Sequence, residues 1–272
     1  MTYYRTAAAA MLLAFAFPAQ AQDTDPPEPV TVSGSVALVS DYRFRGVSQT
    51  DEEMALQGGL TVSHESGLYA GAWASNLAGW GTFGGANMEL DLYAGYKVDL
   101  GSSAALDVGV TWYMYPGGAD DTDFAEAYVK VGGTLGPVTA LAGVAYAPEQ
   151  QALGNYSNTP YSAGQKQDNL YLWGDLSSGV PGTPLTVKAH LGYSDGNPGL
   201  GPNGTSIAPT GSYLDWMLGA DVAVGPLTLG VAYVDTDISK ADSAYLLPNF
   251  ASTKDGGSIA DATVVFSVSA SF

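Results

Sequence analysis

Apolar and polar residues alternate with a period of two along most of the chain beyond residue 33. The clearest segment is 88–100, where the even-numbered residues are apolar and the odd-numbered residues include Glu89, Asp91 and Lys97. A helix would spread these charges around its circumference, whereas a strand with lipid on one side and water on the other separates them. The pattern therefore predicts membrane-spanning β-strands.

The same alternation recurs along the chain and predicts an even number of strands, whose lengths are close to the roughly 9–11 residues that a tilted membrane strand needs. We place these strands at residues 34–45, 56–65, 68–77, 88–100, 105–115, 124–135, 138–147, 169–176, 185–194, 213–224, 227–235 and 261–272. This arrangement predicts an all-β protein, a transmembrane antiparallel up-and-down β-barrel of about 12 strands.

The connections between these strands alternate between long and short. Those after the odd-numbered strands are long, whereas most of those after the even-numbered strands are tight turns such as Ser66-Gly67, Gly136-Pro137 and Gly225-Pro226. Glycine permits unusual backbone angles, and proline cannot donate a hydrogen bond to a neighbouring strand. Outer-membrane barrels have short periplasmic turns and longer external loops, so we expect both termini in the periplasm.

The N-terminus has the features of a secretory signal peptide. Residues 1–5 carry a positive charge, residues 7–17 are apolar, and Ala19-Gln20-Ala21 fits the small-x-small cleavage rule. The apolar run is too short for a transmembrane helix. We predict a cleaved signal peptide at 1–21, a short flexible lead-in at 22–33 that is rich in proline and acids, and a barrel domain at 34–272.

The C-terminus ends in an amphipathic strand. Residues 261–272 alternate between a face with Val264 and Phe266 and a face rich in serine, and the last residue is Phe272. A final strand with a terminal phenylalanine resembles the insertion signal of outer-membrane barrels. This resemblance implies recognition by the barrel-assembly machinery and a location among the lipids of a Gram-negative outer membrane.

Composition excludes several classes of protein. The chain has 27 acidic and 9 basic residues, a net charge of −18, and no cysteine. So acidic a surface argues against nucleic-acid binding and against adhesion to anionic lipid through a basic patch. Without disulfides, a secreted chain of this size must gain its stability from an extensive fold or a membrane. After the signal peptide no apolar run is long enough for a spanning helix.

The chain beyond the predicted signal peptide is similar to a known family over most of its length, most strongly before residue 132. The stretch 34–50, GSVALVSDYRFRGVSQT, resembles the opening of the proteobacterial TorF family of porin-like proteins, also catalogued as Gcw_chp, a family of unknown function. The similarity continues through residues 57–59, 64–71, 73–76, 89–96 and 113–117. It implies an outer-membrane barrel with a pore. It implies no catalytic residues and no particular substrate.

Charged residues on the predicted strands are expected to point into the barrel, because a basic residue facing lipid near the bilayer midplane costs about 2–4 kcal/mol. In the first strand Asp41, Arg43 and Arg45 share the face opposite Tyr42 and Phe44. The other inward positions that we predict are Gln57, Glu89, Asp91, Glu126, Lys130, Asn169, Asp175, Lys188, His190, Asp215 and Asp221. These groups either form a constriction that selects permeants or join in salt bridges that hold the wall.

Three alternatives to an open channel are considered. The first is an enzyme, but His64 falls on an apolar face, His190 points inward, and neither belongs to a recognisable Ser-His-acid arrangement. The second is a structural or ligand-binding barrel that acts through loops 148–168, 195–212 and 236–260. In the third, the same loops fold inward and narrow the pore. Acidic loop clusters lack a calcium-loop spacing, so we predict neither a metal site nor a cofactor.

These observations favour a narrow outer-membrane channel for the passive diffusion of small polar or ionic solutes, and not an enzyme. The net negative charge predicts a mild preference for cations, weakened because salt screens the charge of the loops within ~8–10 Å. The sequence does not identify the permeant or the oligomeric state.

Overall fold

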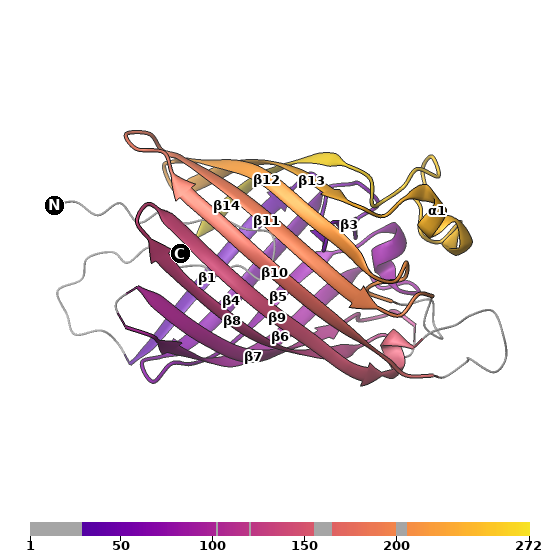
Figure 1. Cartoon of the computed structure of the whole chain (residues 1–272), viewed down its shortest axis with the longest axis horizontal. Helices are drawn as coiled ribbons and strands as arrows, with labels where there is room; N and C mark the ends of the chain where they lie inside the picture. The colour runs from indigo at the N-terminus through magenta and orange to yellow at the C-terminus, as the bar shows by residue number, and fades with distance from the viewer. Residues whose placement is uncertain (1–28, 102, 120, 155–164, 200–205) are drawn as a thin grey trace.

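The computed structural model describes residues 29–101, 103–119, 121–154, 165–199 and 206–272. The predicted signal peptide and most of the predicted lead-in lie outside these residues. Twelve long strands form one closed antiparallel barrel (Figure 1). These strands are β1 (Val30–Val39), β4 (Ala55–His64), β5 (Leu68–Asn76), β6 (Met88–Asp99), β7 (Ala104–Met114), β8 (Phe124–Leu135), β9 (Val138–Gln150), β10 (Gln167–Gly179), β11 (Leu185–Gly196), β12 (Tyr213–Val224), β13 (Leu227–Thr236) and β14 (Thr263–Ser271).

Every wall strand pairs with its neighbours in the sequence, and β1 closes the barrel by pairing with both β4 and β14. Gly34 and Phe272 exchange two backbone hydrogen bonds of 3.0 Å at the seam. The predicted all-β up-and-down barrel is therefore confirmed. The remaining elements lie in the connections at the long-loop end: β2 (Arg43–Phe44), β3 (Val47–Ser48), η1 (Gly79–Thr82), η2 (Gln151–Leu153), α1 (Lys240–Ser243) and η3 (Ala244–Leu246).

The first predicted strand, 34–45, is wrong at both ends. The strand β1 begins at Val30, inside the predicted lead-in, and ends at Val39. Residues 40–54 then leave the wall and enter the barrel, where β2 pairs with β3. The pattern misled because residues 40–48 also alternate between apolar and polar, although both of their faces are buried inside the barrel.

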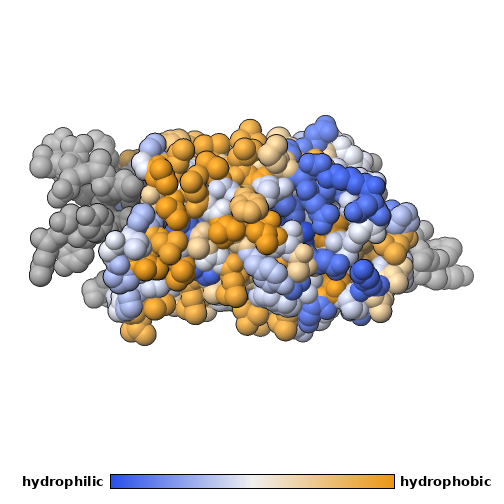
Figure 2. Space-filling model, turned by 90° about the horizontal axis from the view of Figure 1, so that it is seen from above, coloured by the Kyte–Doolittle hydropathy of each residue, from blue (hydrophilic) through white to orange (hydrophobic). Residues whose placement is uncertain are grey.

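The outer surface carries an apolar belt. On β6 the exposed side chains include Leu92, Tyr96 and Val98, and on β14 they include Val264 and Phe266. Figure 2 shows this hydrophobic surface over the strands and a hydrophilic zone toward the long-loop end. Exposed apolar side chains alternate with buried polar ones, as expected for a barrel in lipid. None of the helices among the described residues is long and apolar enough to cross a membrane.

The largest apolar core lies inside the barrel near the long-loop end. Trp80, Phe83 and Phe250 come from connections between strands, and Tyr113 and Phe124 come from the wall. Trp80 and Phe250 pack edge to face with ring centroids 5.0 Å apart. Consequently, this end of the interior is filled by loops that turn inward.

Candidate functional site

The segment 40–54, called here the inward segment, turns back on itself inside the barrel. At its tip Arg45 and Gly46 have φ angles of 49° and 81°, and a two-residue hairpin with both angles positive is a type I′ turn. A Cβ added to Gly46 would lie 2.3 Å from Cγ2 of Thr236. Because that distance is far below van der Waals contact, the tip requires glycine at this position.

Arg45 extends from this turn across the lumen. Its Nη2 donates to the Glu126 carboxylate of β8 at 2.6 and 2.8 Å, and its Nη1 donates to Oδ1 of Asn169 on β10 at 2.8 Å. The guanidinium also lies over the Tyr171 ring, 4.1 Å from its centroid, and the Tyr213 hydroxyl donates to the Arg45 carbonyl at 3.1 Å. The buried guanidinium thereby joins β8 to β10, and the backbone carbonyl of Arg45 adds a contact to β12.

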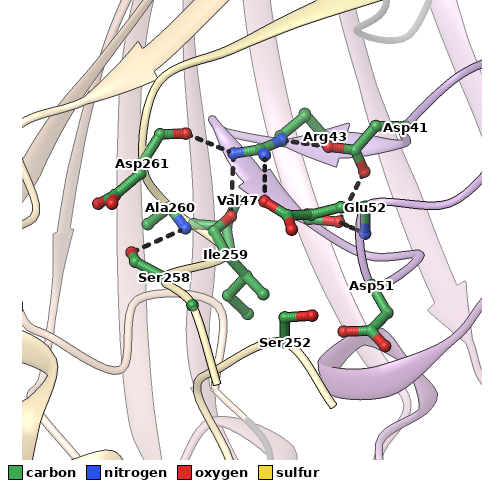
Figure 3. A network of polar contacts seen from close by, with 12 residues as sticks. Asp41, Arg43, Val47, Asp51, Glu52, Ser252, Ser258, Ile259, Ala260 and Asp261 are labelled. Carbon is green, nitrogen blue, oxygen red and sulfur yellow. Dashed lines mark hydrogen bonds and ion pairs between the residues drawn. The ribbon is translucent and has the colours of Figure 1, made fainter. Parts of the chain in front are cut away.

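Arg43 fixes the base of the inward segment instead (Figure 3). Its Nε donates to Oδ2 of Asp41 at 2.5 Å, and its Nη1 donates to the carbonyls of Ile259 at 2.9 Å and Asp261 at 3.0 Å. The two arginines were predicted to share one face of a strand. They point to different partners because Arg43 lies on β2, whereas Arg45 lies in the turn that follows it.

A second contact ties the inward segment to the loop before β14. The Thr253 N–H donates to Oδ1 of Asp51 at 2.9 Å, and the Thr253 hydroxyl donates to Oδ2 of Asp51. Burial alone would raise the pKa of Asp51, but the hydrogen bonds from Thr253 and Ser252 and the nearby Lys254 lower it below the ordinary value of 3.8. The ionised form of Asp51 therefore holds the loop.

Farther toward the short-turn end, charges pair within the wall. Lys130 Nζ lies 3.4 Å from Oδ2 of Asp107, directly across β7 and β8. Lys188 Nζ donates to Oδ2 of Asp221 on the adjacent strand β12 at 2.9 Å. Each of these pairs joins two neighbouring strands and therefore lies along the wall.

His190 on β11 lies between two carboxylates. Its Nδ1 is 2.7 Å from Oδ1 of Asp175, and its Nε2 is 3.2 Å from Oδ1 of Asp215. The Tyr171 hydroxyl is 2.9 Å from the same Nε2. Because Tyr171 also stacks under Arg45, the histidine cluster is contiguous with the cation that crosses the lumen.

The described structure places every polar position proposed from the sequence inside the barrel. Nearly all of these side chains are buried: Asp41, Arg43, Arg45, Gln57, Glu89, Asp91, Glu126, Lys130, Asn169, His190, Asp215 and Asp221 by residue exposure, and Lys188 by side-chain exposure. Asp175 is partly exposed.

Sequence reasoning missed the tyrosines that organise this interior. Tyr171 and Tyr213 hold Arg45, and the Tyr42 hydroxyl donates to Oε1 of Glu89 at 2.9 Å. The dipeptide Arg45-Gly46 was the available signal for a turn, because glycine in a run of alternating residues often marks a break in the strand. Nothing in the local sequence signals a contact to Glu126, 81 positions away.

Comparison with known proteins agrees with this geometry. A family model described as "Bacterial protein of unknown function (Gcw_chp)" matches residues 23–272. The NanC porin has 10% sequence identity and a TM-score of 0.53, with coverage of 89% of this chain and 99% of that chain. The KdgM porin in complex with disordered oligogalacturonate has 8% identity and a TM-score of 0.50, with coverage of 89% and 98%.

At such low identity the likeness to these solved structures shows a porin-like barrel fold alone. No curated protein sequence matches the chain.

Proposed function

The chain belongs to the bacterial family of unknown function Gcw_chp, and we propose that it is an outer-membrane channel for the passive diffusion of small polar or ionic solutes. The observation that carries this proposal is a charged interior inside a closed barrel with an apolar outer belt. The apolar belt is stable against lipid, whereas so many charged side chains are stable only in the polar interior of a barrel.

The inward segment is proposed to be the constriction of this channel. It narrows the lumen from within because Arg45 bridges it to β8 and β10. Residues 206–208 and the buried Leu246, Phe250 and Ile259 pack around it at the same end. The described parts of the long loops thus favour loops that fold inward over loops that present an external binding surface.

The orientation and biogenesis of the barrel are part of the same proposal. Export by a cleaved signal peptide at 1–21 would leave the lead-in and the short-turn end in the periplasm, and the long loops would face outward. Phe272, which closes the seam with Gly34, would be recognised by the barrel-assembly machinery. No catalytic role is proposed, since among the described residues the ring nitrogens of His190 contact Asp175, Asp215 and Tyr171 and no serine nucleophile.

The test is planar-bilayer recording on refolded mature protein, with a variant in which residues 41–53 are replaced by a short glycine-serine linker. We expect discrete current steps from the natural protein and larger steps from the variant, because the linker removes the constriction. The control carries the same linker in the exposed short turn 181–183 and is expected to behave like the natural protein. Folded, heat-modifiable barrels that pass no current in any form would contradict the channel function.

A further inference from the structure

Two inward carboxylates on β6 have no basic partner among the residues that the structure describes. Among the described residues, the salt bridges of the wall and the inward segment involve six other inward acids: Asp41, Asp107, Glu126, Asp175, Asp215 and Asp221. None of these salt bridges reaches Glu89 or Asp91, which lie two positions apart on the same buried face of β6. A buried carboxylate is costly unless something neutralises it.

Two oxygen atoms at this place also lack hydrogen-bond partners. They are Oδ1 of Asp91 and Oγ1 of Thr111, and the two residues are 3% and 0% exposed. Asp91 pairs with Tyr113 across β6 and β7, and Thr111 is two positions before Tyr113 on the same inward face. Diagonal neighbours of this kind lie within roughly 7–8 Å of each other. The orphan hydroxyl of Thr111 thus lies near Asp91, whose own Oδ1 is the other orphan, and oxygen atoms of this kind favour a positive charge.

A small cavity reaches Glu89 from the long-loop side. Its volume is about 10 Å³, close to what one water-sized particle needs. Its walls include Phe44, Trp80, Tyr115 and Phe250, and its lining contains no basic residue among those that the structure describes. Aromatic faces attract cations, so this cavity is a suitable entrance for a small cation and a poor one for an anion.

We propose that Glu89, Asp91 and Thr111 form a binding site for a small monovalent cation on the permeation path. The inference deepens the proposed channel function by naming its substrate class. The ligand atoms are oxygens, which suits a hard cation, but calcium takes 6–8 of them. The described residues bring no group of three metal-binding side chains together. A cation of water size, such as potassium or ammonium, fits the cavity beside Glu89, and Asp91 follows two positions later on the same face of β6.

Binding is tested first through the thermal stability of the protein, in an experiment that does not depend on its passing current. Refolded mature protein is heated in potassium, ammonium, calcium or N-methylglucamine chloride at one ionic strength, and the loss of the heat-modifiable folded form is measured on gels. We expect the midpoint temperature of this loss to rise with the logarithm of potassium or ammonium concentration, since a ligand that binds only the folded state stabilises it in this way. Asp91→Asn is expected to lose this dependence.

Two further variants keep the result interpretable. Asp99→Asn removes the same charge from the same face of β6 at its exposed short-turn end and is expected to retain the potassium dependence. Thr111→Val removes the orphan hydroxyl without changing the shape of the side chain. If the Thr111 hydroxyl is a ligand, this substitution weakens the dependence of the unfolding midpoint on potassium. If it raises the midpoint in every salt and leaves that dependence intact, Thr111 is an unsatisfied packing residue and the site is overturned.

Other outcomes also contradict the site. A midpoint that is identical in all salts, together with a higher midpoint for Asp91→Asn, would mean that a shared proton neutralises the two carboxylates. Stabilisation by calcium alone would overturn the monovalent assignment. In either case the proposed channel function is untouched, because it does not depend on what binds at β6.

Permeation is measured separately by reversal potential under a potassium chloride gradient. We expect the ratio of potassium to chloride permeability to exceed one in the natural protein and to fall toward one in Asp91→Asn, with Asp99→Asn unchanged. A protein that shows potassium-dependent stability but passes no current contradicts the channel and leaves the site standing. A channel without any potassium-dependent stability contradicts the site alone.

Discussion

The two halves of the lumen use charged pairs in different ways. Toward the short turns, Lys130 and Lys188 pair with acids on the adjacent strand, so each pair lies along the wall. Toward the long loops, Arg45 comes from the inward segment and reaches Glu126 and Asn169 across the interior. Pairs within the wall join neighbouring strands, whereas the pair of Arg45 with Glu126 ties the proposed constriction to the far side of the barrel.

The substitution that should have the largest effect on this difference is Arg45→Ala. It leaves Glu126, which is 3% exposed, as a buried charge without its partner, and breaking a buried pair costs about 3–5 kcal/mol. We therefore expect a clear fall in the free energy of unfolding, measured by urea titration in lipid vesicles, together with larger current steps.

The combination of Arg45→Ala with Glu126→Gln separates the effect on stability from the effect on the current steps. Removing both charges should recover much of the lost stability, since no unpaired charge remains, but the current steps should stay large. Recovery of the small natural steps in this double variant would show that the arginine does not hold the constriction.

A smaller effect is expected from Gly46→Ala at the tip of the inward segment. Its φ of 81° and the clash with Thr236 both disfavour alanine, and a residue held in such a conformation costs about 1–3 kcal/mol. Because the strain is local, we expect the segment to become accessible to external protease while the barrel stays folded.

Gly101 offers a matched control for this change. Its φ is 82°, but an added Cβ would meet nothing within 4 Å. Gly101→Ala therefore reports the backbone strain alone. Equal protease sensitivity in the two variants would indicate that packing against Thr236 plays no part.

The smallest effect concerns the contact between Asp51 and Thr253. The pKa of Asp51 is lowered in the folded protein below its ordinary value of 3.8, so its stabilising contribution is present above that value and is lost as the pH falls through the folded pKa. We expect hydrogen exchange at Thr253 to increase below pH 3.8 by more than at neighbouring amides. In Asp51→Asn this additional acid dependence should disappear, and its persistence would assign the effect to another group.

The wall was largely predictable from the sequence, because lipid forces a period of two on every spanning strand. The observed β8 and β12 match the predicted bounds, and most of the other strands differ by a few residues at their ends. The inward direction of Glu89, His190 and Asp215 followed from the same rule, since a charge must avoid lipid.

The inward segment was not predictable by that rule. Asp41, Arg43 and Arg45 alternate with Tyr42 and Phe44 as a wall strand would, but the chain there is surrounded by protein and not by lipid and water. Its path is decided by contacts to residues far along the chain, such as Ile259 and Glu126. Periodicity carries no information about such contacts, so only the three-dimensional structure reveals them.

The inward segment begins and ends at one point of the wall. Val39 and Ala55 face each other in register on β1 and β4, so the residues between them form a loop whose two ends are already side by side. The pairing of β1 with β4 is therefore complete without the inward segment, whose place in the lumen is set by its own contacts, such as those of Arg45 with Glu126 and of Asp51 with Thr253. The wall is a closed frame, and the inward segment is an insertion between two of its paired strands.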